Sequence, residues 1–533
     1  MNIYFIGMCI SMLIYILIGF IVSRKIRDAD DFYVAGRNAP VLLISGSMIA
    51  SYTSTGMFMG DAAQCYDGAF SAVILFAGMQ SAGYIIGAVF FGRYLRRSNI
   101  LTIPAFFGKR FCSDKMRILA ALTAIITMTV YLLSVMQGIG TLMHVVTGVD
   151  YRVCIFLSLT VFTFISVLSG SRGVLITDTL MAGVFTFALI LSVLVISRNV
   201  GGWYGGIRLL ASDSGTSAIL SWSGKPGPLY DTGTENVIWG LTYGIMWMSV
   251  CMVGPWQSSR YIMAKDEHTV IRSSFFSALG VFLLEFLVGM AAVMVNVANP
   301  GMEDSSQVMI WAAMHMMPRI LGVILLTGVL SAGISSATTF LSLIGASVAN
   351  DLAVNSHKKD SIKAGRIAMM SASLIVLFLA VYNPPAIFWI MLLGVAIIAS
   401  SWMPVAVAAV FSKRLTKTGA FCGMLTGFLS CFALRLYASL FHITLPIYLD
   451  PGIVGTAFNV IAMTIGSLLT KVTEDEKNAR AELFIIPKAE QNPVEIQKTL
   501  RYSRLSVSVG IIVMLLLLFL WVIPYLQGTA SKG

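Results

Sequence analysis

Residues 45–56 read Ser45-Gly46-Ser47-Met48-Ile49-Ala50-Ser51-Tyr52-Thr53-Ser54-Thr55-Gly56, inside an apolar segment long enough to cross a membrane. A helix that faces only lipid gains nothing from so many hydroxyls and glycines, which indicates an interrupted helix. Five segments later the chain reads Trp239-Gly240-Leu241-Thr242-Tyr243-Gly244, then Trp247, and closes with Gly254-Pro255. Interruptions at corresponding places in two halves are typical of inverted-repeat transporters, whose unwound backbone binds ions and substrate. Tight helix packing by small residues is the alternative.

The composition around these two segments is that of a membrane protein. Of the 533 residues, 57% are hydrophobic and 11% are charged, and the mean hydropathy is +0.84. A soluble domain carries about 25% charged residues, so an ordinary soluble enzyme and a secreted disulfide scaffold are excluded. The net charge of +11 lies in short connectors, so no nucleic-acid partner is expected. The seven cysteines form no CxxC pair, so neither a disulfide framework nor a cysteine-based metal site is expected.

Fourteen apolar segments are long enough to cross a bilayer about 30 Å thick, allowing for tilt. The segments run over residues 3–22, 42–64, 70–92, 118–147, 153–169, 174–197, 236–257, 274–297, 319–347, 367–382, 386–411, 419–440, 452–470 and 505–525. The sequence therefore predicts an all-α polytopic membrane protein with about 14 transmembrane helices. The connector 471–504 alternates charges and is expected to be partly helical.

Lys and Arg are concentrated in alternate connectors, and positively charged loops are retained on the cytoplasmic side of a membrane. This basic set includes Arg172, Arg260 and Lys265. The opposite set holds only a few, namely Arg152, Arg198, Arg208, Lys225, Arg319 and Lys532. We therefore expect a multi-pass protein of the plasma (inner) membrane with both termini outside.

A hydroxyl face in segment 319–347 is the candidate ion site. Ser335, Thr338, Thr339 and Ser342 recur at intervals of three and four residues and so share one helical face. Sodium is a hard cation that prefers oxygen ligands, so hydroxyls opposite unwound carbonyls predict a sodium site. Alternatively, each hydroxyl bonds a carbonyl of its own helix, which is common for Ser and Thr in membrane helices.

Three carboxyl groups, Asp61, Asp178 and Glu285, lie inside apolar segments. A charge at the bilayer centre costs at least about 2.5 kcal/mol, so each is expected to face the bundle interior with a partner. Asp178 is interpreted as an ion ligand or a helix cap, and Glu285 as a structural group that is protonated or hydrogen-bonded. A proton-coupled carrier that uses Asp61 or Glu285 is the alternative. The five histidines form no catalytic constellation, so an enzyme is not expected.

Several motifs resemble the sodium:solute symporters and follow the order of that family over roughly residues 30–440. The motifs are Asp31-Phe32-Tyr33-Val34-Ala35-Gly36-Arg37, Gly173 to Asp178, Gly254-Pro255-Trp256-Gln257-Ser258-Ser259-Arg260-Tyr261, Ala332 through Asp351-Leu352, and Lys413-Arg414-Leu415-Thr416-Lys417-Thr418-Gly419-Ala420. The resemblance implies a core of two inverted five-helix repeats, with broken first and sixth core helices, as in the leucine-transporter type of fold.

The resemblance also implies how the chain is divided. Residues 1–440 are expected to form the transporter region, with an extra N-terminal helix at 3–22, the inverted-repeat core at about 41–411 and an additional helix at 419–440. Residues 441–533 are expected to hold two further helices and the cytoplasmic connector 471–504.

The site residues that the resemblance implies fall into three groups. Sodium would be bound by Ala50, Thr53, Ala332, Ser335 and Ser336. A second sodium, used by some members, would lie at Asp178, Thr338 and Thr339. Substrate contacts would fall near Ser54, Thr55, Gly56, Gln137, Tyr243 and Trp247. Tyr52 stands where the proline-transporting branch has an acidic residue, and the polar side-chain set of the sugar carriers is not evident.

The expected function is sodium-coupled symport of a small organic solute by alternating access. The pocket has no obvious Lys or Arg, so a small carboxylate, an amino acid or a vitamin acid such as pantothenate would be neutralised by a half-helix N-terminus or by sodium. Sodium, the solute and the lipid bilayer are the expected partners.

Overall fold

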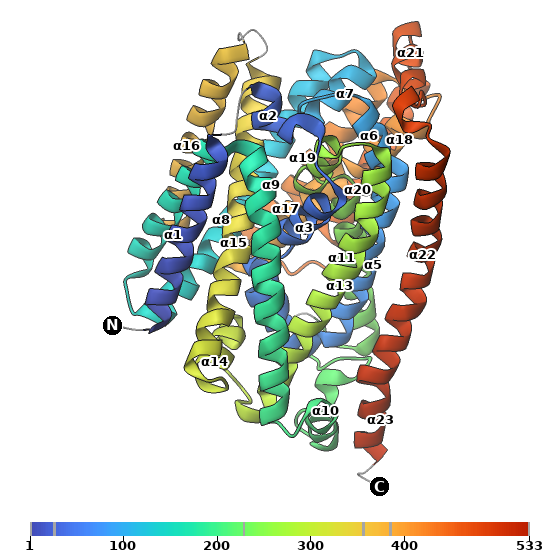
Figure 1. The fold of residues 1–533 in the computed structure, drawn as a ribbon. Helices are drawn as coiled ribbons and strands as arrows, with labels where there is room; N and C mark the ends of the chain where they lie inside the picture. Colours follow the sequence, from blue (N-terminus) through green and yellow to red (C-terminus); the bar gives the residue numbers. More distant parts are fainter. Residues whose placement is uncertain (1–2, 25–27, 228–229, 354–357, 383–385, 531–533) are drawn as a thin grey trace.

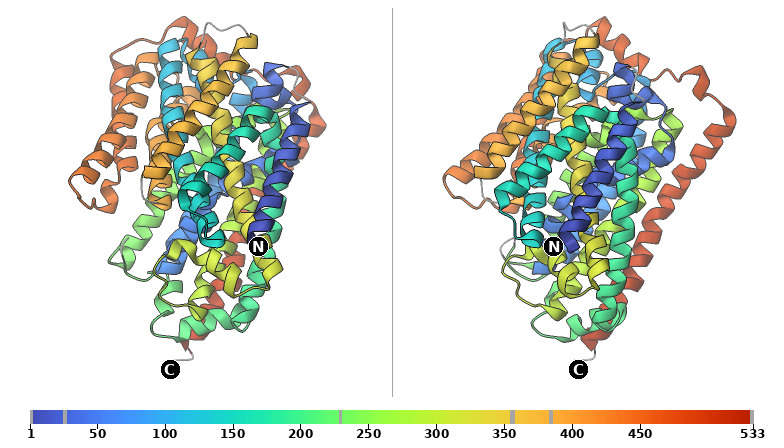
Figure 2. Two further views of the ribbon diagram at one scale, coloured as in Figure 1. Left: turned by 90° about the vertical axis from the view of Figure 1, so that its left-hand side faces the viewer. Right: turned by 60° about the vertical axis from the view of Figure 1, so that its left-hand side comes forward.

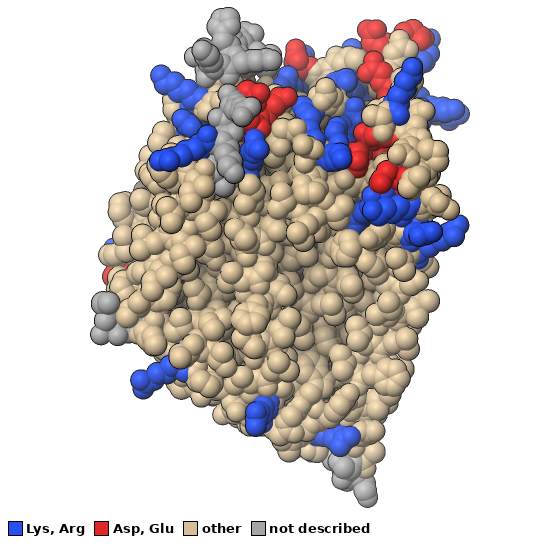
Figure 3. All heavy atoms as spheres, in the orientation of Figure 1, with Lys and Arg blue, Asp and Glu red and all other residues tan. Residues whose placement is uncertain are grey.

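The computed structural model describes residues 3–24, 28–227, 230–353, 358–382 and 386–530, and these form long helices joined by short connectors (Figure 1). In this part of the chain, thirteen helices are long and apolar enough to cross a membrane. Two further views show the same bundle, with the helices between residues 417 and 468 at one side and the C-terminal helix at another (Figure 2). On the face shown in Figure 3, charged side chains gather at one end of the molecule, and a broad area with almost no charge covers its middle.

The first core helix accounts for the difference between about fourteen predicted spans and thirteen observed ones. Helix α3 (Val41–Tyr52) has only 12 residues, too few to cross the membrane alone. The chain resumes as a helical run from Gly56 to Arg97 that turns at Gly68, where φ is 119°. The first core helix is therefore two half-helices on either side of Thr53, and its outer half leads directly into α5 (Phe70–Gly87).

The other spanning helices agree with the predicted segments in number and order. The first repeat continues with α8 (Asp114–Thr147) and α9 (Tyr151–Asn199), and α9 contains two spans because Gly170, at φ 54° and ψ −165°, interrupts it. The later helices are α11 (Gly233–Val253), α12 (Pro255–Met263), α13 (Glu267–Ala298), α15 (Arg319–Ser347), α16 (Lys358–Tyr382), α17 (Ile387–Ser401), α18 (Met403–Phe411), α19 (Lys417–Leu440) and α20 (Pro451–Leu468). Helix α1 (Ile3–Ser23) precedes them, and α22 (Pro493–Leu517) with α23 (Ile523–Ala530) completes the last span.

Two groups of helices enclose the broken helix. In one group α5 packs against α11 and α13, and in the other α15 packs against α8, α9 and α16. Helix α3 contacts α13 of the first group and both α9 and α15 of the second. The first break therefore lies at the junction of the two groups. A change in the relative position of the groups would alter the geometry at the break.

The second interruption lies later in the chain than the glycine-rich stretch suggested. Helix α11 stays helical through Gly240 and Gly244, and the break comes at Gly254, where ψ is 137°. Pro255 starts α12, since a proline without an N–H fits the first turn of a helix. Gly240 serves packing instead, because a Cβ there would lie 3.0 Å from the carbonyl oxygen of Ala72 on α5.

The connector before the last span is partly helical, as predicted. It contains α21 (Glu474–Glu482), which begins with a reciprocal pair of hydrogen bonds between Thr473 and Glu476. Arg110, on the short helix α7 (Ile103–Phe111), donates to the carbonyls of Ala409 and Glu476 at 2.6 and 3.1 Å. The connector therefore packs over the charged end of the bundle.

Candidate functional site

Among the described residues, the first break leaves oxygen atoms without hydrogen bonds inside the buried core of the bundle. Helix α3 ends at Tyr52, and the N–H of Thr53 still bonds the carbonyl of Ile49 at 2.9 Å. The last carbonyls of a helix have no partner within it, so those beyond Ile49 are available for a ligand. Thr53 Oγ1 is buried and has no hydrogen-bond partner among the described residues.

Helix α15, which carries the predicted hydroxyl face, packs beside this break. Ala332, Ser335 and Ser336 are fully buried, and α15 contacts α3. Ser336 Oγ, like Thr53 Oγ1, has no partner among the described residues. Ser335 Oγ donates its only proton to Asp178 at 2.7 Å, which leaves its lone pairs for a cation. Buried, unpartnered oxygens of this kind fit sodium, so the predicted group of Ala50, Thr53, Ala332, Ser335 and Ser336 can hold it.

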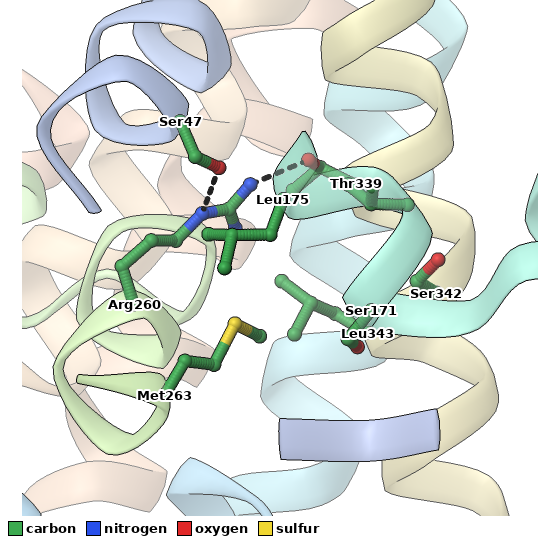
Figure 4. Close-up of a pocket in the computed structure, with 9 residues that line it drawn as sticks. Ser47, Ser171, Leu175, Arg260, Met263, Thr339, Ser342 and Leu343 are labelled. Carbon is green, nitrogen blue, oxygen red and sulfur yellow. Dashed lines mark hydrogen bonds between the residues drawn. The ribbon is translucent and has the colours of Figure 1, made fainter. Parts of the chain in front are cut away.

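The predicted second ion position contains a cation of the protein itself. Asp178 accepts hydrogen bonds from Ser47 at 2.7 Å and from the Arg260 guanidinium at 2.9 Å. Arg260 also donates to Thr339 Oγ1 at 2.7 Å (Figure 4). Both charged side chains are at most 2% exposed. The ion pair therefore neutralises Asp178 inside the bundle, where an unpaired charge would be costly.

Asp178 and Thr339 thus come together, but Thr338 does not join them. Thr338 Oγ1 donates to the carbonyls of Ile334 and Ser335 on its own helix, at 2.9 and 3.0 Å. This is the alternative that the sequence left open for the hydroxyls of this face.

A small cavity adjoins the ion pair. It measures about 10 Å³, which is room for roughly one water-sized group. Arg260 and Thr339 line it together with Ser47, Ser171, Val174, Leu175, Met263, Ser342 and Leu343. Arg260, expected in a connector, is buried on α12. The signal in the sequence is its place in the motif Gly254–Tyr261, whose aromatic residues Trp256 and Tyr261 are buried with it.

The predicted substrate residues divide into two sets. Ser54 accepts the N–H of Gly56 at 3.0 Å, and Thr55 donates to the carbonyl of Val135 on α8 at 3.3 Å. Trp247 faces this region, because its ring meets that of Tyr52 edge-on at 5.3 Å between centroids. Its indole Nε1 is buried and has no partner among the described residues.

Gln137 and Tyr243 are engaged elsewhere. Gln137 Oε1 accepts the N–H of Ala386 at 3.0 Å, and the Tyr243 hydroxyl donates to Asp450 at 3.3 Å. Tyr131 of α8, which the sequence did not single out, takes a place beside the break. Its ring packs against Trp247 at 6.4 Å, and its hydroxyl lies within hydrogen-bonding reach of Ser54.

The two other buried carboxyl groups meet each other. Asp61, from the outer half of the first core helix, lies within hydrogen-bonding reach of Glu285 on α13. The Tyr52 hydroxyl is 2.6 Å from Gln80 Oε1 and 3.1 Å from Glu285 Oε2. Neither carboxyl belongs to an ion pair among the described residues.

Comparison with known proteins places this arrangement in a family. The profile of the Sodium:solute symporter family matches residues 32–427. The chain belongs to that family. As a family member it is a transporter embedded in a membrane, and sodium is supported as its coupling ion.

Two solved transporters resemble this symporter in fold. One is a Na⁺-coupled sialic acid symporter in a substrate-bound, outward-open state, with a TM-score of 0.74 at 18% identity, covering 89% of this chain and 99% of that one. The other is Mhp1, a nucleobase-cation-symport-1 family transporter in a closed conformation with bromovinylhydantoin bound. It has a TM-score of 0.54 at 11% identity, covering 85% of this chain and 98% of that one. The predicted inverted-repeat fold with broken first and sixth core helices is confirmed.

Proposed function

We propose that this symporter couples the inward flow of sodium to the uptake of a small carboxylate, an amino acid or a vitamin acid such as pantothenate. The observation that carries the proposal is a pair of buried hydroxyls without partners among the described residues, Thr53 Oγ1 and Ser336 Oγ. Thr53 lies at the break after α3, and Ser336 lies on α15, which contacts α3. Sodium is bound there by these hydroxyls, by Ser335 and by the carbonyls of Ala50 and Ala332. The plasma (inner) membrane, with both termini outside, is the proposed location.

The solute is proposed to bind one turn farther out, at the start of the outer half-helix. Ser54, Thr55 and Gly56 form that start, and Trp247 and Tyr131 close over it. No Lys or Arg is among these residues, and the N-terminus of a half-helix attracts anions. A carboxylate is therefore met by backbone amides and by the sodium at Thr53, so each ligand is expected to strengthen binding of the other.

The coupling follows from the position of the ion between the two helix groups. Sodium that contacts both α3 and α15 ties the two groups together in one arrangement, and its loss to the cytoplasm frees them to move. A membrane potential of about 100 mV contributes roughly 2.3 kcal/mol per charge. A tenfold sodium gradient adds about 1.4 kcal/mol, so one ion supports a solute gradient of several hundredfold.

The test is a thermal melt of the purified protein in sodium and in potassium, with a panel of carboxylates and amino acids. We expect a sodium-specific rise in melting temperature that one class of solute enlarges, followed by sodium-driven accumulation of that solute in proteoliposomes. A folded protein that ignores sodium, and whose uptake follows pH alone, would overturn the proposal in favour of the proton-coupled alternative.

A further inference from the structure

The pair formed by Asp61 and Glu285 has no role in the sodium site, yet it lies deep in the bundle. Asp61 is 2% exposed and Glu285 is 1% exposed. Two ionised carboxylates accept hydrogen bonds but cannot donate one, so carboxyl groups at hydrogen-bonding distance from each other must share a proton. Two adjacent negative charges without a counter-ion would also be strongly disfavoured at this depth.

The side chains around the pair supply hydrogen bonds but no positive charge. Tyr52 of α3 donates to Glu285, while Cys65, Cys251 of α11 and Tyr131 of α8 are the other titratable groups that face it. None of these carries a positive charge in any protonation state.

One buried oxygen of the pair has no hydrogen-bond partner in the part of the chain that the structure describes. Asp61 Oδ1 has no donor among the described residues. The side-chain amide of the neighbouring Gln80 on α5 lies within hydrogen-bonding reach of Glu285. Gln80 is fully buried. A carboxyl oxygen that served only to join helices would be expected to accept a hydrogen bond. The free acceptor on Asp61 leaves room for the hydrogen bonding of the pair to change.

A cavity lies about one helical turn from Asp61 along its own helix. Gln64 follows Asp61 by about one helical turn and lines this cavity of about 220 Å³ with Asp67, Lys225 and Trp389. This cavity lies at the end of the molecule where the connector after α10 (Trp203–Ser212) folds over the bundle. This cavity is the nearest described space in which water could receive a proton from the pair.

We propose that Asp61 and Glu285 form a proton-binding site that holds one proton between them and releases it to water when sodium binds. The sodium link rests on the proposed function. Tyr52 carries the link, because its hydroxyl bonds Glu285 while the next residue, Thr53, contributes to the sodium site. A sodium ion near the pair weakens proton binding by the pair. By reciprocity, we expect sodium affinity to rise about tenfold from acid to alkaline pH.

The proton itself is tested by infrared difference spectroscopy of the full chain in bilayer discs. We expect the carbonyl band of a protonated carboxyl, shifted by exchange into heavy water and lost in Asp61→Asn and in Glu285→Gln. The matched control is Glu303→Gln, which removes an exposed carboxyl and should leave the band unchanged. Absence of the band from wild type would overturn the proposal, because the pair would then be ionised or hold a metal cation.

The link to sodium is tested by adding sodium chloride to weakly buffered protein with a pH-indicator dye. We expect release of up to one proton per wild-type chain, none with potassium chloride and none from Glu285→Gln. Tyr52→Phe is the variant to use if Glu285→Gln does not fold. It keeps both carboxyl groups and removes a hydrogen-bond donor that favours the ionised form of the pair. It should raise the pH of half-maximal release by about one unit.

The outcomes separate this inference from the proposed function. Sodium stabilisation without proton release overturns the proton link and leaves the symport proposal standing. A protonated carboxyl band in a protein that ignores sodium overturns the symport proposal and keeps the proton site.

Discussion

At the scale of single residues, the buried oxygens without a hydrogen-bond partner among the described residues are the most informative. Ser335 and Ser336 are neighbours on α15 and both are fully buried, but only Ser335 is hydrogen-bonded to another helix. A buried hydroxyl without a partner carries a desolvation cost that the fold alone does not repay. Ser336 is therefore the residue whose loss should separate ion binding from folding.

Ser336→Ala should weaken sodium binding about tenfold, the change that about 1.4 kcal/mol produces, while the melting temperature in potassium stays as in wild type. The measurement is the sodium concentration for half-maximal thermal stabilisation. Ser342→Ala is the matched control, since its hydroxyl is also buried and unpartnered on α15 but lies outside the proposed ligand group. An unchanged sodium response in Ser336→Ala would contradict the assignment.

The buried ion pair makes a different prediction. Asp178→Asn or Arg260→Met should each lower the free energy of unfolding by about 3–5 kcal/mol, because each leaves a buried partner unpaired. The double variant should lose clearly less than the sum of the two, in a denaturation series in one detergent. The exposed pair Glu474–Lys477 is the control, and its removal should change stability by less than about 1 kcal/mol. Additive losses at Asp178 and Arg260 would argue against a direct pair.

At the scale of elements, two glycines of α5 set its distance from α11. A Cβ on Gly83 would lie 2.6 Å from the carbonyl oxygen of Met248, and one on Gly87 would lie 2.6 Å from Met252 Cα. Both of these contacts involve backbone atoms, which cannot turn aside as a flexible side chain would. The close approach of α5 and α11 therefore depends on glycine at these positions.

Gly83→Ala should destabilise the protein by about 1–3 kcal/mol, as overpacking of a well-filled interior does. Gly78→Ala on the same helix meets nothing within 4 Å, so it should be neutral or slightly stabilising because alanine favours the helix. Thermal melts of the two variants beside wild type are the measurement. Equal effects of the two substitutions would show that the spacing of α5 and α11 is not limited by Gly83.

The helices also show which features could be predicted from the sequence. Apolar length predicted nearly every span, and the hydroxyl spacing in 319–347 picked out a buried face on which Ser335 and Thr339 contact the Asp178–Arg260 pair. Glycine was ambiguous, because Gly240 serves packing and Gly254 a break, and only the neighbouring helix distinguishes them. Arg260 with Asp178, and Asp61 with Glu285, could not be paired from spacing, since their contacts depend on how distant segments pack.

At the scale of the whole molecule, charge is distributed unevenly between the two ends. Lys, Arg, Asp and Glu gather at the end that holds α7 and α21, and few lie at the other (Figures 1 and 3). Both described chain ends, near Ile3 and Ala530, point toward the sparsely charged end (Figure 1). By the positive-inside rule, the charged end is expected to face the cytoplasm.

This orientation is tested by thiol labelling in intact cells. Cys112 is exposed just after α7, so a membrane-impermeant maleimide should reach it only after the cells are opened. In a Cys112→Ser chain, Ala530→Cys should be labelled in intact cells, because Ala530 is exposed at the opposite end. Labelling in the reverse pattern would invert the proposed topology.

The last helix is held mainly at its ends. Near its start Glu495 pairs with Arg272, and near its end the Trp203 and Trp521 indoles donate to Leu520 and Leu220 carbonyls at 2.7 and 3.1 Å. Only 6% of its most apolar window is buried against protein.

Lipid tails are therefore the solvent that keeps the middle of this helix in place. A micelle of short-chain detergent is thinner than a bilayer, so it leaves part of the apolar span without matching apolar surroundings. An early, detergent-dependent melting step then reports on this helix and not on the transport core. Extraction conditions that preserve the surrounding lipid annulus are those under which one cooperative unfolding transition is expected.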